Sequence, residues 1–281
     1  MALLDYDRLV VRLPSLSECY RTAEEFPHIV LDDLLDSASL EEALEQFPAV
    51  NNERWIHYRH FNERKIGLNK RDYIPPSLLA IIDELNSDQF VAFLSALTGI
   101  PGLLADPTLE GGGLHQIERG GFLNIHADFT VHPHRRNWRR RVNVLVYLNP
   151  QWEEQFGGHL ELWTKDMKRA FRKVLPILNR CVIFNTDKDS FHGHPDPLTC
   201  LEGTTRKSIA LYYFTEESGV PAKIGTNYQS RPVDGLRGVG IYVDNRILWA
   251  YNWLKGKLGI NDDFASRVLR FLSRNADKNR H

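Results

Sequence analysis

The amino-acid sequence predicts an α+β protein, with a core of short strands between N-terminal helices and a C-terminal helical extension. From residue 111 to residue 216, Gly-rich breaks separate short runs of β-favouring residues, a pattern typical of a sandwich or barrel. The flanking segments instead repeat apolar residues at three- and four-residue steps, which is the period of an amphipathic helix. We therefore expect three parts, at residues 1–110, 111–216 and 217–281.

The composition is that of an ordinary globular protein. The 281 residues include 35 Lys and Arg against 36 Asp and Glu, and 42% are hydrophobic, which excludes a disordered chain or a highly basic nucleic-acid coat. Three scattered cysteines, Cys19, Cys181 and Cys200, do not suit a disulfide framework or a cysteine zinc site. The sequence shows no signal-peptide pattern and no apolar run of about 18 residues. We expect a cytoplasmic protein with no membrane partner.

Residues 1–110 are expected to form a helix and strand scaffold that packs on the core. Residues 28–31 form an apolar run that suits a strand. Ser37 can cap a helix that Pro48 ends, and two further helices are expected from Pro76 and from about Asp88, since proline is favoured in a first helical turn.

The core and the C-terminal extension follow. Core strands are expected at residues 122–125, 142–148, 159–163, 181–185 and 208–214. Two helical patterns are expected at residues 247–258 and 264–272. Such apolar helix faces are usually stabilised by packing, so the extension packs on the sheet or on a second subunit of a homodimer. The alternative is a lid that covers the substrate.

Metal-ligating side chains occur in and after the predicted core strands. His126 and Asp128 are two residues apart in a strand, so both project from the same face. His192 and His194 follow the strand at residues 181–185, where a turn is expected to start. Two histidines and one carboxylate are the ligand set of non-haem Fe(II) oxygenases, which leaves coordination positions open. The spacing alone does not decide between His192 and His194.

An arginine begins the last core strand. Alternation places Arg206, Ser208, Ala210, Tyr212 and Phe214 on one face. An arginine in an apolar setting needs an anionic partner, and its planar fork suits a carboxylate, to which the Ser208 hydroxyl can add a hydrogen bond. The alternative is a structural pair with an Asp or Glu at the rim of the sheet.

These residues, in this order and spacing, resemble the Fe(II)/2-oxoglutarate-dependent oxygenase superfamily, and most closely its prolyl-4-hydroxylase-like branch. Residues 140–149, 157–162 and 180–184 support the resemblance. It implies a double-stranded β-helix (jelly-roll) core with Fe(II) at its open end. It also implies that 2-oxoglutarate is the co-substrate, and that Arg206 and Tyr147 bind its distal carboxylate.

The resemblance also implies which histidine is the distal ligand. In the family this ligand follows an aromatic or small residue, which selects His192 after Phe191. His126, Asp128 and His192 are then the catalytic metal ligands. His194, which precedes Pro195, would lie behind the ligands or face the substrate.

The activity implied by the resemblance is that of a dioxygenase, which uses O2 to hydroxylate a C–H bond while 2-oxoglutarate is converted to succinate and CO2. The leading hypothesis takes a protein side chain, such as proline, as the substrate. One alternative keeps this chemistry but takes a small metabolite or biosynthetic intermediate. Another is a catalytically silent jelly-roll module that binds a metal or a partner. A requirement for ascorbate to keep the iron reduced is left open.

A basic run and several histidines remain. Residues 135–141 contain five arginines and one tryptophan. We interpret this run as a solvated or salt-bridged loop, since the protein is nearly neutral, so no nucleic-acid partner is expected. Recognition of an acidic substrate is the alternative. His132, His134 and His159 are expected to be loop or surface residues.

Overall fold

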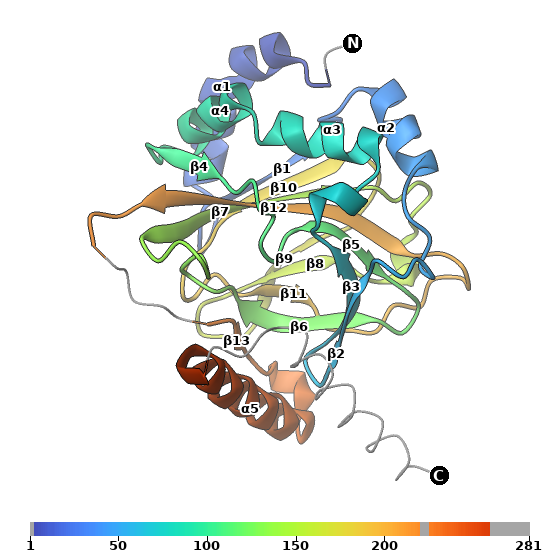
Figure 1. The fold of residues 1–281 in the computed structure, drawn as a ribbon, viewed down its shortest axis with the longest axis vertical. Coiled ribbons are helices and arrows are strands. Elements are labelled where there is room, and N and C mark those ends of the chain that lie inside the picture. The colour runs from blue at the N-terminus through green and yellow to red at the C-terminus, as the bar shows by residue number, and fades with distance from the viewer. Residues whose placement is uncertain (1–2, 220–224, 259–281) are drawn as a thin grey trace.

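In the computed structural model, which describes residues 3–219 and 225–258, thirteen antiparallel strands form one curled sheet. Four helices cover one face of this sheet, and the other face is closed by the sheet's own second half (Figure 1). The predicted α+β class with a jelly-roll core is confirmed.

The helices agree with the expected pattern, with one addition. In chain order they are α1 (Tyr6–Arg21), α2 (Ser37–Glu45), α3 (Pro76–Leu85), α4 (Asp88–Thr98) and α5 (Arg237–Leu258). Helix α2 begins at Ser37, but its cap is Asp36, whose carboxylate accepts from two backbone N–H groups. Helix α4 ends at Gly99, which has a φ of 73°. Helix α1 was not expected, because Pro14 lies inside it.

The strands come from both sides of residue 111. They are β1 (His28–Asp32), β2 (Ile56–His60), β3 (Glu63–Leu68), β4 (Leu103–Ala105), β5 (Gly113–Ile117), β6 (Phe122–Ala127), β7 (Trp138–Tyr147), β8 (Leu160–Trp163), β9 (Ala170–Val174), β10 (Arg180–Asn185), β11 (His192–His194), β12 (Arg206–Glu216) and β13 (Asn227–Tyr228). Their spatial order is β1-β10-β7-β12-β5-β3-β6-β11-β8-β9. Strands β13, β2 and β4 pair with β6, β3 and β12 respectively.

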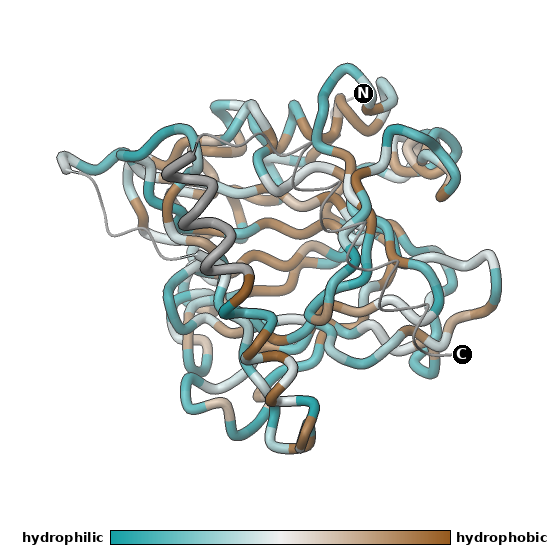
Figure 2. Tube along the Cα trace, turned by 60° about the horizontal axis from the view of Figure 1, so that its bottom comes forward, coloured by the Kyte–Doolittle hydropathy of each residue, from teal (hydrophilic) through white to brown (hydrophobic). Residues whose placement is uncertain are grey.

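Strand alternation divides the core into two layers. On β7, Val142, Val144 and Val146 pack in the large cluster beneath the helices. The intervening residues face the interior between the two halves of the sheet, where Tyr147 packs with Phe184. Figure 2 shows apolar strands through the centre of the molecule. Polar residues on the interior face of such strands are therefore buried, and they form the candidate site.

The C-terminal segment joins the same sheet. Strand β13 pairs with β6, and Tyr228 lies opposite His126. Helix α5 contains the helical pattern expected at residues 247–258, while the pattern at 264–272 lies outside the described residues. No helix in the described ranges is long and apolar enough to cross a membrane.

Candidate active site

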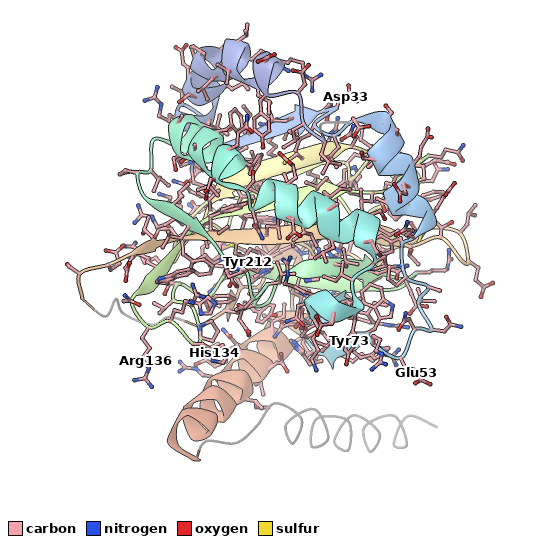
Figure 3. The ribbon with its side chains drawn as sticks, turned by 45° about the horizontal axis from the view of Figure 1, so that its top comes forward. Asp33, Glu53, Tyr73, His134, Arg136 and Tyr212 are labelled. Carbon is pink, nitrogen blue, oxygen red and sulfur yellow. The ribbon has the colours of Figure 1, made fainter. Side chains whose placement is uncertain are left out.

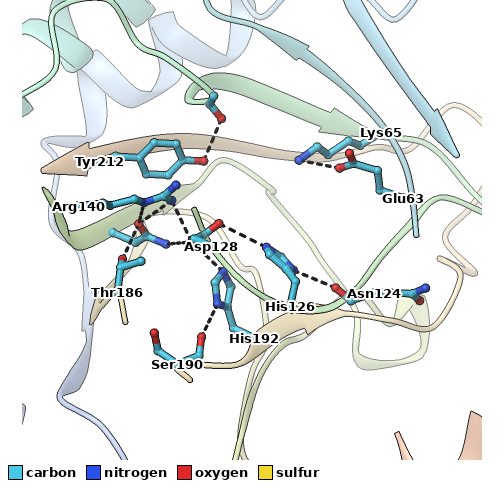
Figure 4. A network of polar contacts seen from close by, with 12 residues as sticks. Glu63, Lys65, Asn124, His126, Asp128, Arg140, Thr186, Ser190, His192 and Tyr212 are labelled. Atoms are coloured by element: carbon cyan, nitrogen blue, oxygen red, sulfur yellow. Dashed lines mark hydrogen bonds and ion pairs between the residues drawn. The ribbon is translucent and has the colours of Figure 1, made fainter. Parts of the chain in front are cut away.

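The structure brings His126, Asp128 and His192 together. Strand β6 carries His126, Asp128 follows its end, and His192 lies opposite His126 as the first residue of β11. Each offers a ligand atom, and these atoms lie within 4.8 Å of one another. The two Nε2 atoms are each 3.5 Å from an oxygen of Asp128 (Figure 4). His192 thus begins a short strand rather than the expected turn.

Backbone carbonyls orient both imidazoles. Nδ1 of His126 lies 2.9 Å from the carbonyl oxygen of Asn124, and Nδ1 of His192 lies 3.0 Å from that of Ser190. Because a carbonyl only accepts, each Nδ1 carries the proton and each Nε2 directs its lone pair toward Asp128. Burial lowers the pKa of His192 to about 4, so this imidazole is neutral near neutral pH. Two imidazoles and one carboxylate fit a divalent transition metal.

A buried arginine and an asparagine hold the Asp128 carboxylate in place. Oδ2 of Asp128 accepts hydrogen bonds from Arg140 at 2.9 Å and from Asn143 at 2.7 Å. Burial alone would raise the pKa of Asp128, but the Arg140 guanidinium, together with the two imidazoles, outweighs burial and holds this pKa well below its usual range. The guanidinium is stacked 3.4 Å from the ring centre of Tyr212. Asp128 is therefore a fixed carboxylate anion.

Arg140 corrects the interpretation of the basic run as a solvated or salt-bridged loop, because Arg140 lies in strand β7 and forms its ion pair with Asp128 in the interior. Its side chain is 1% exposed, whereas Arg136 lies at the edge of the molecule (Figure 3). In the β7–β12 pairing, Val142 lies opposite Tyr213 and Arg140 lies opposite Phe214. One extra residue of β7 is thus accommodated in a bulge, which turns Arg140 to the interior face. His132 lies in a loop, as expected, but it is buried beside Asp106 rather than at the surface.

Arg206 lies at the other end of the interior face. It is 5% exposed, and its Nε donates to the carbonyl of Gly158 at 2.8 Å. Its Nη2 donates to the Tyr147 hydroxyl at 3.2 Å. No carboxylate in the described ranges is an ion-pair partner of Arg206. A buried guanidinium without an acid is costly, so this end of the pocket suits an anionic ligand rather than the structural pair considered above.

Strands β7 and β12 run from the metal-type cluster to Arg206 along the interior face. On β7, Asn143 contacts Asp128 and Tyr147 contacts Arg206. These two positions are four residues apart in a strand, a separation of about 13 Å. Beside them, β12 carries Ser208 opposite Tyr147 and Tyr212 opposite Asn143. Both strands therefore fix the distance from the metal-type cluster to the guanidinium.

His194 is separate from the three-residue cluster. It is 3% exposed, and neither ring nitrogen has a hydrogen-bond partner in the described part of the chain. The assignment of His126, Asp128 and His192 as ligands, and of Arg206, Ser208 and Tyr147 as co-substrate residues, stays a prediction.

Comparison with known proteins identifies the family. The model of the 2OG-Fe(II) oxygenase superfamily matches residues 112–214. We refer to this matched segment as the oxygenase domain. The oxygenase domain contains the His-x-Asp motif, His192 and Arg206, so the superfamily resemblance is confirmed.

Relatives of the oxygenase domain include prolyl hydroxylases. Over 255 residues the chain is 25% identical to mouse prolyl 3-hydroxylase OGFOD1, and the match covers 87% of this chain and 43% of the mouse protein. The chain therefore spans less than half the length of that relative.

Solved structures of prolyl hydroxylases share the fold. One is a prolyl hydroxylase from Trichoplax adhaerens in complex with a hypoxia inducible factor peptide, with a TM-score of 0.53, 21% identity, and coverage of 74% of this chain and 91% of that one. Another is a Pseudomonas putida prolyl-4-hydroxylase, with a TM-score of 0.52, 15% identity, and coverage of 73% and 100% respectively. The prolyl-4-hydroxylase-like fold is thus confirmed.

A second polar network beside the oxygenase site was not expected from the sequence. His60 lies 2.8 Å from Glu63 through Nε2 and 3.1 Å from Asp244 of α5 through Nδ1. Glu63 also pairs with Lys65 at 3.0 Å. The tip of β2 and β3 is rich in charge, so it carries no apolar strand signal. This network links α5 to strands β2 and β3.

The His60 network gives the stability of the protein a specific pH dependence. Burial alone would lower the pKa of His60, but hydrogen bonds to Asp244 and Glu63 outweigh it and raise the pKa from 6.5 to about 9. A pKa raised on folding contributes stability that is complete below pH 6.5 and is lost as the pH rises through about 9. We expect His60→Gln to reduce the fall in unfolding free energy over this range, as measured by urea titration.

The control is His134→Gln, since His134 is exposed and lies on another loop. Its pH dependence should match that of the unmodified chain. Identical curves for His60→Gln and the unmodified chain would mean that His60 is not charged in the folded protein.

Proposed function

We propose that this chain is an Fe(II)- and 2-oxoglutarate-dependent dioxygenase that hydroxylates a C–H bond of a prolyl residue in a protein. The observation that carries the proposal is a buried His-Asp-His cluster at one end of the interior face of the sheet and, at the other end, a buried arginine without an acid partner in the described ranges. The family match and the relatives support the reaction type.

The ligand roles follow from the donor set. His126, Asp128 and His192 would hold the iron through two Nε2 atoms and a carboxylate oxygen, which leaves part of the coordination sphere to the co-substrates. The chemistry supplied by bound iron is the activation of O2, with one oxygen atom ending in succinate as CO2 is lost and the other in the substrate hydroxyl. Arg140 and Asn143 keep Asp128 ionised and oriented.

The co-substrate roles follow from the opposite end. Arg206 would bind the distal carboxylate of 2-oxoglutarate, with the hydroxyls of Tyr147 and Ser208 as further donors. Tyr147 already contacts Arg206, and Ser208 lies opposite Tyr147 in the sheet. Their burial among apolar residues strengthens these interactions by excluding water.

The proposal extends to the substrate and the location. A prolyl substrate is supported by the names of the mouse relative and of the two solved structures. A cytoplasmic location is supported by Cys19, Cys181 and Cys200, which are all free thiols. Ascorbate would act as a reductant for the iron and not as a stoichiometric substrate.

The test is a coupled assay with the full chain, Fe(II), 2-oxoglutarate and a panel of proline-containing peptides. We expect succinate release that depends on one class of peptide, and the gain of one oxygen atom on its proline in tandem mass spectra. Succinate release with small metabolites but with no peptide would show that the substrate is a small metabolite and not a prolyl residue. If the chain shows neither metal-dependent 2-oxoglutarate binding nor succinate release, the proposal that it is a dioxygenase is refuted.

Replacing Arg206 tests the co-substrate end. Arg206→Ala is expected to weaken 2-oxoglutarate binding by roughly 1.5–3 kcal/mol, the range for hydrogen bonds to charged groups, or about 10- to 150-fold. The measurement is the 2-oxoglutarate KM or, without turnover, its Kd. Arg180→Ala is the matched control, because Arg180 forms a partly exposed pair with Asp32. Equal affinity in both variants would remove Arg206 from the binding site.

A further inference from the structure

His194 is a buried side chain whose hydrogen-bonding capacity the protein does not use. It is 3% exposed, and both ring nitrogens are buried without a partner in the ranges 3–219 and 225–247. The imidazoles of His126 and His192 differ, since a backbone carbonyl accepts from each Nδ1. Buried polar groups are nearly always hydrogen-bonded, and an unmade bond costs about 1–3 kcal/mol. This exception points to a ligand.

The position of His194 indicates which part of the protein interior its ring faces. On β11 it lies two residues after His192. The register with β6 shifts between these two residues, but the pairing with β8 is regular at His192 and Gly193, and its continuation places His194 beside Leu160. Neighbouring β8 places Leu162 opposite His192, and Leu160 and Leu162 pack with Tyr147 in the interior cluster. Tyr147 is the residue whose hydroxyl contacts Arg206. The ring therefore belongs to the interior layer that holds the guanidinium.

The charges around His194 indicate the ligand's chemistry. The charged side chains that act on it are, in order, Arg206, Lys65 and Glu63. Lys65 and Glu63 form an ion pair with each other, whereas Arg206 has no acid partner among the described residues. The net field on this part of the pocket is therefore positive. A carboxylate could accept from Arg206 and from an imidazole N–H at the same time.

We propose that His194 is a co-substrate-binding residue, whose ring N–H donates to the 2-oxoglutarate carboxylate that Arg206 binds. This inference rests on the proposed function and deepens it. In every protonation state an imidazole has at least one N–H donor, and hydrogen bonds to a carboxylate are stronger than neutral ones. With Arg206 and a hydroxyl, His194 makes a three-sided site that favours a dicarboxylate over a 2-oxo acid with one carboxylate.

The test measures binding rather than turnover. The full chain is loaded with Mn(II), which accepts the same nitrogen and oxygen ligands, and titrated calorimetrically with 2-oxoglutarate. His194→Met, which has no N–H, is expected to raise the Kd roughly 10- to 100-fold. His194→Gln, which keeps an N–H donor, is expected to recover most of this loss. The Mn(II) affinity measured without 2-oxoglutarate is expected to stay unchanged in both variants.

The controls separate this inference from the proposed function. His134→Met, on an exposed loop, should bind 2-oxoglutarate as the unmodified chain does. Failure of the unmodified Mn(II)-loaded chain to bind 2-oxoglutarate would refute the proposed function itself. If the unmodified chain and His194→Met bind 2-oxoglutarate with equal affinity, only the role of His194 is overturned. The same holds if His194→Met loses as much affinity for Mn(II) as for 2-oxoglutarate. If His194→Met does not fold, His194→Leu takes its place.

Discussion

Asp128→Ala is expected to abolish turnover and to remove most of the metal affinity. Asp128 supplies the anionic member of the cluster, and its two oxygens lie 3.5 Å from the Nε2 atoms of His126 and His192. Loss of a residue behind metal ligands already costs about 10- to 100-fold in affinity, so loss of a ligand should cost more. The measurement is Fe(II) or Mn(II) titration followed by the succinate assay.

The matched control for Asp128→Ala is Asp83→Ala. Asp83 is an exposed residue of α3 that pairs with Arg71, so this change removes the same charge far from the pocket. We expect normal metal binding and turnover in the control. Full metal occupancy and normal turnover in Asp128→Ala would show that the cluster is not the metal site.

Arg140→Met is expected to lower the free energy of unfolding by about 3–5 kcal/mol, the cost of removing one partner of a buried ion pair. The substitution leaves Oδ2 of Asp128 with Asn143 as its remaining donor and removes the cation stacked on Tyr212. We further expect Mn(II) to restore part of the lost stability, since a bound cation offsets the charge of Asp128. Urea unfolding with and without Mn(II) measures both effects.

Arg180→Met is the control for this second substitution. Arg180 also binds a carboxylate, through two hydrogen bonds to Asp32 of 2.7 and 2.8 Å, but at an exposed site. Exposed pairs contribute about 0–1 kcal/mol, so the control should be nearly neutral. Equal losses in the two variants would mean that the Arg140 pair is no more important than a surface one.

The metal-type cluster and Arg206 could be predicted because they follow strand periodicity. His126 and Asp128 share a face by alternation, and so do Arg206 and Ser208. The resemblance to a family then selected His192 over His194. The structure groups His192 with the other two candidates, although the ligand role itself awaits the metal titration.

The residues that the sequence analysis missed depend on a bulge and on long-range pairings, which strand periodicity does not reveal. Arg140 reaches the interior because a bulge in β7 shifts the alternation by one residue, and the arginines around it resemble a solvated loop. The His60–Glu63–Asp244 network joins segments about 180 residues apart in the chain. Local patterns carry no information about such pairings.

The spacing of Asn143 and Tyr147 on β7 has a consequence for how this protein could change over evolution. A single-residue insertion or deletion between them would turn one of the two outward into the valine layer beneath the helices. The distance from the metal-type cluster to Arg206 is therefore set by the residue spacing along one strand. New substrates would have to be accommodated by altering the loops around the opening, while the reach from metal to guanidinium stays constant.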